Sequence, residues 1–166
     1  MNKVPNNIEI INHIGKNVKI GKNVKIWHFT YIGDDVKIGD NVTIGSLTHI
    51  DYKVEIGDNC RIQGSVYVPP FTIISNDVFL GPGIIITNDL YPPSKKLSKT
   101  IIEEGAIIGA GSILKAGIKI GRNSVVAMGS LVTKDVLQDT VVMGNPAKPV
   151  FSRETYEKKR ERWENN

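Results

Sequence analysis

The stretch Asn17–Phe29, NVKIGKNVKIWHF, contains nearly the same six residues twice in succession. The repeat continues in both directions, because an aliphatic residue falls on every sixth position from Ile14 to Ile86. A small or β-branched residue usually stands two positions earlier, and Gly followed by Asn or Asp commonly comes after. The unit is therefore V-x-I-G-x-N, and a short period sustained over so many units indicates a repeat architecture.

The chemistry of this unit predicts one short strand and one turn. V-x-I has the two-residue alternation that places both apolar side chains on one face of a strand. Gly and Asn tolerate positive φ, so G-x-N predicts a corner. A single unit cannot bury its own apolar edge, and we therefore expect successive units to wind and stack into an all-β solenoid.

The rhythm stops in the segment TNDLYPPSKKLSKT, Thr87–Thr100, and resumes in a new phase from Ile102. Ile86 and Ile102 are 16 positions apart where the repeat needs six, so about ten extra residues loop out. Loops that project from a rigid scaffold commonly carry function. A surface insertion without a role is equally compatible with the sequence.

The charged end of the chain, SRETYEKKRERWENN (Ser152–Asn166), predicts a short helix. Ser152 suits its N-cap, and Tyr156 and Trp163, seven residues apart, give it a thin apolar stripe. We expect this helix to cover the exposed end of the coil stack or to pack on a neighbouring subunit.

Length and composition indicate one domain of 166 residues, with a solenoid over residues 1–151, a projecting loop at 87–101 and a C-terminal helix at 152–166. The single cysteine, Cys60, falls on an inward position and is expected to be a buried small hydrophobe. The net charge of +4 comes from scattered lysines, which favour a solvated face over a nucleic-acid surface. Since no signal peptide and no long apolar run is evident, we expect a soluble, cytoplasmic protein without a membrane partner.

From about Ile14 to Phe151 the chain resembles the hexapeptide-repeat acyltransferases. The resemblance implies a left-handed parallel β-helix with three six-residue faces per coil. It also implies a homotrimer with acyl-coenzyme A in the groove between neighbouring helices. The repeat is specific for the fold and says little about the substrate.

Three further segments narrow the resemblance: IWHFTYIG (26–33), IQGSVYV (62–68) and DVFLGPGIIITND (77–89). They resemble nucleotide-sugar N-acetyltransferases that acetylate a 3-amino sugar, especially the UDP-2-acetamido-3-amino-2,3-dideoxyglucuronate type. The implied partners are acetyl-CoA and a UDP- or dTDP-linked amino sugar of surface-glycan biosynthesis. Pro93 departs from the Arg that relatives usually carry after the first loop proline, which leaves the sugar open.

On the acceptor side, the relatives carry an Asn that matches Asn88, where the regular coil gives way to the loop. Its amide oxygen can accept a hydrogen bond from the sugar amine, although Asn88 and Asp89 would also suit a turn. Asp89 and Gln63 are candidate substrate-binding residues. His28 is expected to face outward, where it can bind the nucleotide sugar, accept a proton or be an ordinary surface histidine.

On the coenzyme side, the segments VVAMGSLVTKDV and VMGNPAKPV resemble the coenzyme-binding signature of the wider superfamily. The residues that this resemblance assigns to coenzyme A are Ala110, Met128, Thr133, Lys134 and Lys148. Gly105 and Ala106 are candidates to offer an oxyanion-stabilising backbone N–H. The GNP sequence also suits a turn that closes the last coil.

Rival interpretations remain open at this point. A γ-carbonic-anhydrase-like zinc site needs three histidines, whereas His13 and His49 lie two coils apart and cannot share a zinc ion, so no metal is expected. A non-catalytic β-helix scaffold would not need the loop. O-acetylation of a sugar hydroxyl would require a general base, and that role favours His28 over Asn88.

Overall fold

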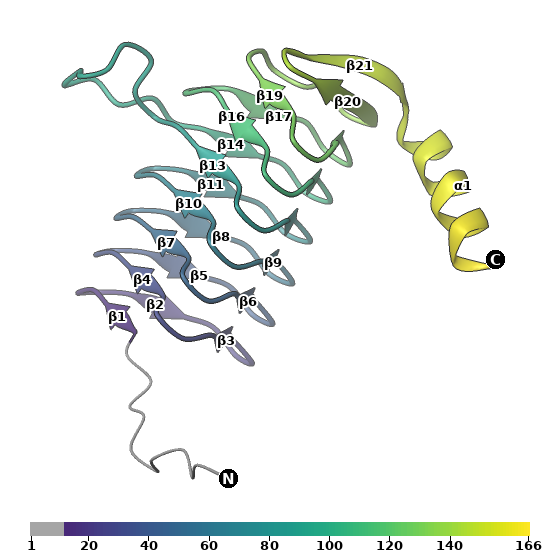
Figure 1. Ribbon diagram of the computed structural model, residues 1–166. Coiled ribbons are helices and arrows are strands. Elements are labelled where there is room, and N and C mark those ends of the chain that lie inside the picture. Colours follow the sequence, from purple (N-terminus) through teal and green to yellow (C-terminus); the bar gives the residue numbers. More distant parts are fainter. Residues whose placement is uncertain (1–11) are drawn as a thin grey trace, which may run out of the picture.

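The computed structural model describes residues 12–166, which form a parallel β-solenoid, a short hairpin and a helix (Figure 1). Within these residues, nineteen two-residue strands wind around a common axis and pair with strands one coil away. This is the predicted architecture, a left-handed parallel β-helix of hexapeptide repeats. The expected solenoid domain 1–151 begins in residues 1–11, which lie outside the described residues.

The strands of the described residues lie in three sheets, one along each side of the solenoid. Sheet A contains β1 (His13–Ile14), β4 (Tyr31–Ile32), β7 (His49–Ile50), β10 (Tyr67–Val68), β13 (Ile85–Ile86), β16 (Ile113–Leu114) and β19 (Leu131–Val132). Sheet B contains β2 (Lys19–Ile20), β5 (Lys37–Ile38), β8 (Glu55–Ile56), β11 (Ile73–Ile74), β14 (Ile101–Ile102) and β17 (Lys119–Ile120). Sheet C contains β3 (Lys25–Ile26), β6 (Thr43–Ile44), β9 (Arg61–Ile62), β12 (Phe79–Leu80), β15 (Ile107–Ile108) and β18 (Val125–Val126), and it is extended by β20 (Thr140–Gly144) and β21 (Ala147–Ser152).

Corners join the sheets in chain order. Corner AB leads from sheet A to sheet B, corner BC from sheet B to sheet C, and corner CA from sheet C back to sheet A. Asn and Asp occupy the left-handed backbone conformation at many corners, as Asn17 does with a φ of 56° and Asn41 with a φ of 58°. The predicted G-x-N corner is confirmed, with positive φ at its Asn. Its Gly does not have positive φ, and glycine is needed there for close packing instead, since a Cβ atom at Gly15 would lie 2.6 Å from the carbonyl carbon of Gly33 in the next coil.

Inward aliphatic side chains form one continuous core, as predicted. Ile32 pairs with Ile50 one coil later, and both side chains are fully buried. Cys60 is also buried in this core. Ile14 and Ile20 are 43% and 45% exposed, because the first described coil has a neighbouring coil on one side only within residues 12–166.

The predicted loop occupies residues 87–100 between β13 and β14 and projects from corner AB (Figure 1). The solenoid continues beneath it without a break, since Ile73 of β11 pairs with Ile101 of β14. The amide N–H of Ser98 donates to the carbonyl oxygen of Asn88 at 2.7 Å. This hydrogen bond closes the insertion at its base. The six-residue repeat resumes after it in a new phase, as predicted.

The antiparallel hairpin of β20 and β21 was not predicted. Asn145–Pro146 lies at its tip, so GNP turns a hairpin and does not close the last coil. The signal was present in the sequence, because a turn-forming Asn-Pro stands between the apolar runs TVVM and AKPVF.

The predicted C-terminal helix is α1 (Arg153–Glu164), and Ser152 is its N-cap, whose hydroxyl accepts from the Thr155 N–H. The helix lies beside the coils, with Tyr156 half-buried and Trp163 79% exposed (Figure 1). In the single chain it therefore does not cover the end of the coil stack. No helix between residues 12 and 166 has the length and apolar character needed to cross a bilayer.

Candidate functional site

The predicted site residues divide among the three corners of the solenoid and the hairpin. Corner CA carries His28, Gln63, Ala110 and Met128. Corner AB carries Asn88 and Asp89 at the base of the loop, and Thr133 and Lys134 after β19. Corner BC carries Gly105 and Ala106, while Lys148 lies on β21. Within one chain, the structure therefore does not bring the predicted site residues together in one pocket.

Corner CA differs from the other corners in its backbone hydrogen bonding. Elsewhere, the N–H of the first turn residue commonly donates to an Asp or Asn of the next coil, as in Lys16 to Asp34 at 2.7 Å and Asp58 to Asn76 at 2.9 Å. The equivalent residues of corner CA are His28, Ser46, Gly64, Pro82, Ala110 and Met128, none of which is Asp or Asn. Within residues 12–166, the N–H groups of Ala110 and Met128 have no hydrogen-bond acceptor.

The open amide of Met128 lies close against Gly109 of the previous coil. At Gly109, a Cβ atom would lie 2.4 Å from the Met128 amide nitrogen, so only glycine fits this position. Open donors one coil apart are spaced by about 4.8 Å along the corner. A linear ligand that carries amide carbonyls can lie along this track of open amides and accept from it.

An apolar hollow of about 410 Å³ adjoins corner CA. Its lining includes Phe79, Ile107 and Val125 of sheet C, Ala110 and Met128 of the corner, Met143 of β20, Phe151 of β21 and Tyr156 of α1. The hairpin and the helix build one wall of it, and sequence analysis missed that wall. The apolar outward residues Phe79, Ile107 and Val125, at positions where β3 and β9 carry Lys25 and Arg61, were the available signal.

Lys148 is placed on the same hairpin, paired with Met143, whose side chain lines the hollow. Both side chains are exposed. A positive charge therefore stands at the edge of an apolar surface, as a ligand with an apolar arm and an anionic end requires.

On corner AB, the backbone of Asn88 closes the loop and leaves its side chain available. The Asn88 carbonyl accepts from Ser98, whereas its side-chain amide has no hydrogen-bond partner within the described part of the chain. Asp89 differs, because its two carboxylate oxygens accept from the N–H groups of Tyr91 and Ser94, at 3.0 and 2.7 Å. Asp89 thus shapes the loop, and Asn88 is the free polar group at its base.

His28 is exposed on corner CA, as expected, between the exposed rings of Trp27 and Phe29. Its ring centroid lies 6.4 Å from that of Phe29 in an edge-on arrangement. Gln63 is half-buried on the same corner, two coils further on. His28 and Asn88 lie on different corners, so the two candidate catalytic groups of one chain belong to different edges.

Gly105 and Ala106 are not free to stabilise an oxyanion. The Gly105 N–H donates to the Asn76 carbonyl at 3.1 Å, and the Ala106 N–H donates to the Glu103 carbonyl at 3.3 Å. The proposed role of these amides is therefore corrected, because both are used within corner BC. Gly105 instead offers its carbonyl to Arg153 of α1.

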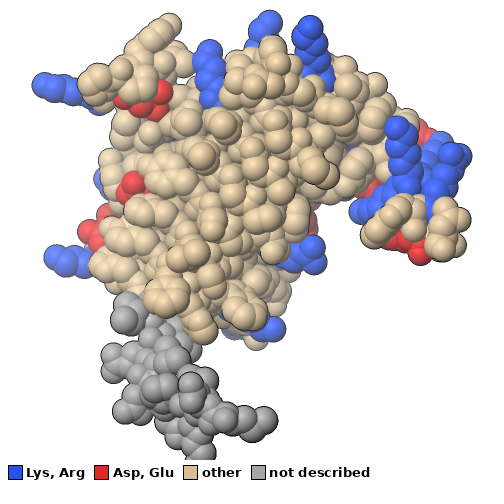
Figure 2. Space-filling model, viewed as in Figure 1, with Lys and Arg blue, Asp and Glu red and all other residues tan. Residues whose placement is uncertain are grey.

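The outward face of sheet A is aromatic and aliphatic, whereas four of the six outward residues of sheet B are charged. The outward side chains of sheet A are His13, Tyr31, His49, Tyr67, Ile85, Ile113 and Leu131, and those of sheet B include Lys19, Lys37, Glu55 and Lys119. The rings of His13, Tyr31 and His49 stack at centroid distances of 4.5 and 4.4 Å. In Figure 2 the face of the solenoid turned to the viewer is broadly uncharged, and Lys and Arg gather at its edges and on α1.

Within residues 12–166, no group of three or more His, Cys, Asp or Glu side chains is arranged to hold a metal ion. Tyr31 lies between His13 and His49, in agreement with the two-coil separation inferred from their spacing. Burial raises the pKa of the Tyr67 hydroxyl, and the Asp51 carboxylate raises this pKa further.

Comparison with known proteins supports the repeat. The pattern of the bacterial transferase hexapeptide (six repeats) matches residues 13–46 and 35–70. The hexapeptide repeat of succinyl-transferase matches residues 99–134. Together the matched ranges cover more than half of the chain.

Similar curated proteins include acetyltransferases for different acceptors. A 2,3,4,5-tetrahydropyridine-2,6-dicarboxylate N-acetyltransferase of Clostridium perfringens is 47% identical over 75 residues, which are 45% of this chain and 31% of that protein. A galactoside O-acetyltransferase of Lactococcus lactis is 40% identical over 81 residues, covering 44% of this chain and 39% of that protein. The alignments thus span well under half of either relative.

Among solved structures, the polySia specific acetyltransferase NeuO aligns with 86% of this chain and 80% of its own chain. The TM-score is 0.59 and the sequence identity is 20%. At that identity, the likeness shows the fold alone.

Proposed function

The chain belongs to the hexapeptide-repeat transferases, and from this premise we propose that it transfers the acetyl group of acetyl-CoA to the amine of a nucleotide-linked amino sugar. The observation that carries the proposal is the track of open amides along corner CA, beside an apolar hollow. The pantetheine arm of coenzyme A has two amide carbonyls on a flexible apolar chain, which suits both features.

We further propose that the site is completed by a second copy in a homotrimer. Sheet A is bordered by corner CA on one edge and corner AB on the other. If the apolar faces of sheet A meet around a three-fold axis, corner CA of one copy lies beside corner AB of the next. Burial of exposed Tyr31, Ile85 and Ile113 would favour this contact.

This arrangement explains why the expected site residues divide between two corners. Ala110 and Met128 of one copy would hold the coenzyme, while Asn88 and the loop of the neighbour would hold the acceptor. Thr133 and Lys134, also on corner AB, would then reach the coenzyme from the neighbour's side, where the lysine can meet a phosphate. Gly105 and Ala106 lie on the third corner, away from the groove.

The chemistry needs positioning more than activation. The neutral amine attacks the thioester carbon, the C–N bond forms as the C–S bond breaks, and the proton that the amine loses protonates the departing thiolate. Asn88 accepts a hydrogen bond from the amine and aims its lone pair at the carbon. Its side-chain amide is suited to this role because the loop does not use it.

O-acetylation of a sugar hydroxyl is the second candidate. A hydroxyl must lose its proton as it attacks, so this reaction needs a general base. The exposed His28 on corner CA is placed on the same edge as the open amides, and the Lactococcus relative is an O-acetyltransferase. The Clostridium relative, with the higher identity, is an N-acetyltransferase.

The decisive experiment offers acetyl-CoA with UDP- and dTDP-linked amino sugars, their hydroxyl analogues and tetrahydropyridine dicarboxylate, and follows release of free thiol. We expect thiol release with a nucleotide-linked amino sugar and none with its hydroxyl analogue. Light scattering should give a particle of about 55 kDa, three times the 18.3 kDa chain. Turnover of only a hydroxyl or dicarboxylate acceptor, or a stable active monomer, would refute the corresponding part of the proposal.

A further inference from the structure

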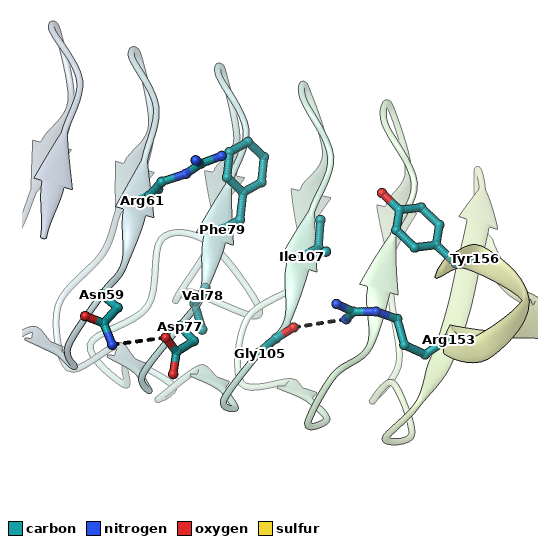
Figure 3. A pocket seen from close by; sticks show the side chains of 9 residues that line it. All are labelled: Asn59, Arg61, Asp77, Val78, Phe79, Gly105, Ile107, Arg153 and Tyr156. Atoms are coloured by element: carbon teal, nitrogen blue, oxygen red, sulfur yellow. Dashed lines mark hydrogen bonds between the residues drawn. The ribbon is translucent and has the colours of Figure 1, made fainter. Parts of the chain in front are cut away.

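A second cleft, of about 490 Å³, lies between the coils and α1 on the side of corner BC. Figure 3 shows its residues in two rows. The row along corner BC contains Asn59, Asp77, Gly105 and Arg153, and the row along sheet C contains Arg61, Phe79, Ile107 and Tyr156. None of these residues lies on corner CA or corner AB, although Phe79, Ile107 and Tyr156 also line the apolar hollow, so the cleft adjoins the proposed acyl-transfer groove on the side of corner BC.

The row along sheet C forms a slot with aromatic walls. Phe79 and Tyr156 stand on either side of Ile107, which comes from the strand between them (Figure 3). A flat ring can lie on the aliphatic side chain and contact one or both aromatic rings. Stacking on an aromatic side chain is available to every base, because every base has a π face.

A cation stands at one end of this slot. The guanidinium carbon of Arg61 lies 5.2 Å from the centroid of the Phe79 ring. Within residues 12–166, Arg61 has neither a carboxylate at ion-pair distance nor a side-chain hydrogen bond. The Phe79 ring holds the guanidinium in place and leaves its N–H groups free to donate to an anion.

The other arginine of the cleft is already engaged. Arg153 donates to the carbonyl oxygens of Gly105 and Asn123 at 3.1 and 2.8 Å and pairs with Glu157. It therefore fixes the helical wall of the cleft. Arg61 is the cation that remains for a ligand.

The row along corner BC adds a hydrogen-bond acceptor for the hydroxyl groups of a ligand. One carboxylate oxygen of Asp77 accepts from the Asn59 amide at 3.1 Å. Along this corner, side-chain amides donate from one coil to the next, as Asn41 does to Asn59 and Asn59 does to Asp77. The series ends at Asp77, because Gly105 at the equivalent position of the next coil has no side chain. The Asp77 carboxylate thus faces the cleft with acceptor capacity to spare.

We propose that this cleft binds a nucleoside phosphate, with the base between Phe79 and Tyr156, the phosphate at Arg61 and the ribose hydroxyls at Asp77. An aromatic slot, one free guanidinium and a carboxylate are the three contacts that such a ligand needs. Two sources share this chemistry, a free nucleotide and the nucleotide end of coenzyme A. Phe79, Ile107 and Tyr156 also line the apolar hollow, so a ligand in the cleft contacts the wall of the coenzyme track.

The test is calorimetric titration of the full chain with UDP, dTDP, ADP, coenzyme A and inorganic phosphate. We expect saturable binding of at least one nucleotide and much weaker binding of phosphate alone. Arg61→Gln should weaken nucleotide binding about ten- to hundred-fold, and Tyr156→Ala about ten-fold. Lys25→Gln, which removes an outward cation of the same sheet outside the cleft, is the matched control and should bind as the wild type does.

Two comparisons separate the possible sources and sites. If coenzyme A binding also depends on Arg61, its own nucleotide occupies the cleft; if only free nucleotides depend on Arg61, the ligand is a separate molecule. Binding of UDP, dTDP and ADP is measured by heat alone, without an acetyl acceptor or thiol release, so failure of the transfer proposal leaves this result untouched. Absence of binding by every nucleotide, or binding that survives Arg61→Gln and is lost in Met128→Glu, would overturn the cleft assignment.

Discussion

The guanidinium of Arg153 donates to the carbonyl oxygen of Gly105, which precedes it by 48 residues. Together with its bond to the Asn123 carbonyl, this contact fastens the first turn of α1 to two successive coils. At Gly105, φ is +69° and a Cβ atom would lie 2.3 Å from the Asn123 amide oxygen. A glycine in one coil and an arginine in the helix thus define how α1 stands on the solenoid.

Arg153→Ala should therefore release α1 while the solenoid stays folded. The variant loses two hydrogen bonds from a charged, largely buried donor, each of the kind that contributes about 1.5–3 kcal/mol. Hydrogen exchange should show the α1 amides exchanging at least about ten-fold faster, with unchanged protection in β7 to β15. Arg162→Ala, in the exposed last turn, is the control, and equal effects of the two substitutions would contradict the anchoring role.

The fold could be predicted from sequence because each six-residue unit carries its own information. The alternation of V-x-I and the tolerance of Asn for positive φ act locally, so residues such as Asn17 and Ile38 can be placed without distant partners. The hairpin was missed because it lies outside the repeat. Its position depends on pairing of Val125 with Val141, a contact that the six-residue period does not encode.

The site was less predictable than the fold. Spacing placed Ala110 and Met128 one coil apart. Comparison of residues eighteen positions apart also shows that corner CA lacks the Asp or Asn that the other corners commonly have. The occupation of the Gly105 amide depends instead on the carbonyl of Asn76 in the previous coil. Likewise, the role of Tyr156 as a wall depends on where α1 docks, which a helical pattern alone does not specify.

Ile38→Ala should destabilise the chain much more than Ile14→Ala. Ile38 is 4% exposed within the stack, and removal of a buried isoleucine side chain beyond Cβ costs about 2–5 kcal/mol. Ile14, at the open first coil, is 43% exposed, so Ile14→Ala should lower the free energy of unfolding by about 1 kcal/mol or less. Urea unfolding followed by circular dichroism gives both values; equal losses would mean that the inward register of the first coils is misassigned.

Cys60 should make stability fall at high pH. Burial raises the pKa of its thiol to about 11, above the pKa of 9.0 expected when the chain unfolds. Both states are protonated below about pH 9, and between about pH 9 and 11 the unfolded state ionises first, so stability is lost as the pH rises. At about 1.4 kcal/mol per pKa unit, this loss is at most about 3 kcal/mol.

The control for this effect is Cys60→Ala, since Ala106 occupies the same position in a later coil. The difference in unfolding free energy between wild type and variant should shrink from pH 8 to pH 11. In the same range, native Cys60 should react with thiol reagents much more slowly than the unfolded chain does. Rapid labelling of the folded protein at pH 8 would show that the thiol is not buried.

Asn88→Ala should lower kcat/KM for the amino sugar about ten- to hundred-fold, because one positioning hydrogen bond of about 1.5–3 kcal/mol is lost. Coenzyme binding and oligomeric state should not change, since the fold uses only the Asn88 backbone. His28→Ala should raise KM if His28 binds the sugar nucleotide and lower kcat if it is a base. Full activity of Asn88→Ala together with inactivity of His28→Ala at every pH would replace amine positioning by base catalysis.

Mixing two impaired variants tests whether the site is shared between copies. Met128→Glu places a negative charge on corner CA where the anionic coenzyme should lie, at a side chain that is 79% exposed and so tolerates substitution. Asn88→Ala impairs corner AB.

In trimers refolded from an equal mixture, each groove takes its corners from two copies, so about a quarter of the grooves combine an intact corner CA with an intact corner AB. Thiol release should then approach about a quarter of the wild-type rate, well above either variant refolded alone. If the mixture shows only the average of the two separate activities, each site is contained in one chain, and the arrangement of sheet A faces around a three-fold axis is wrong.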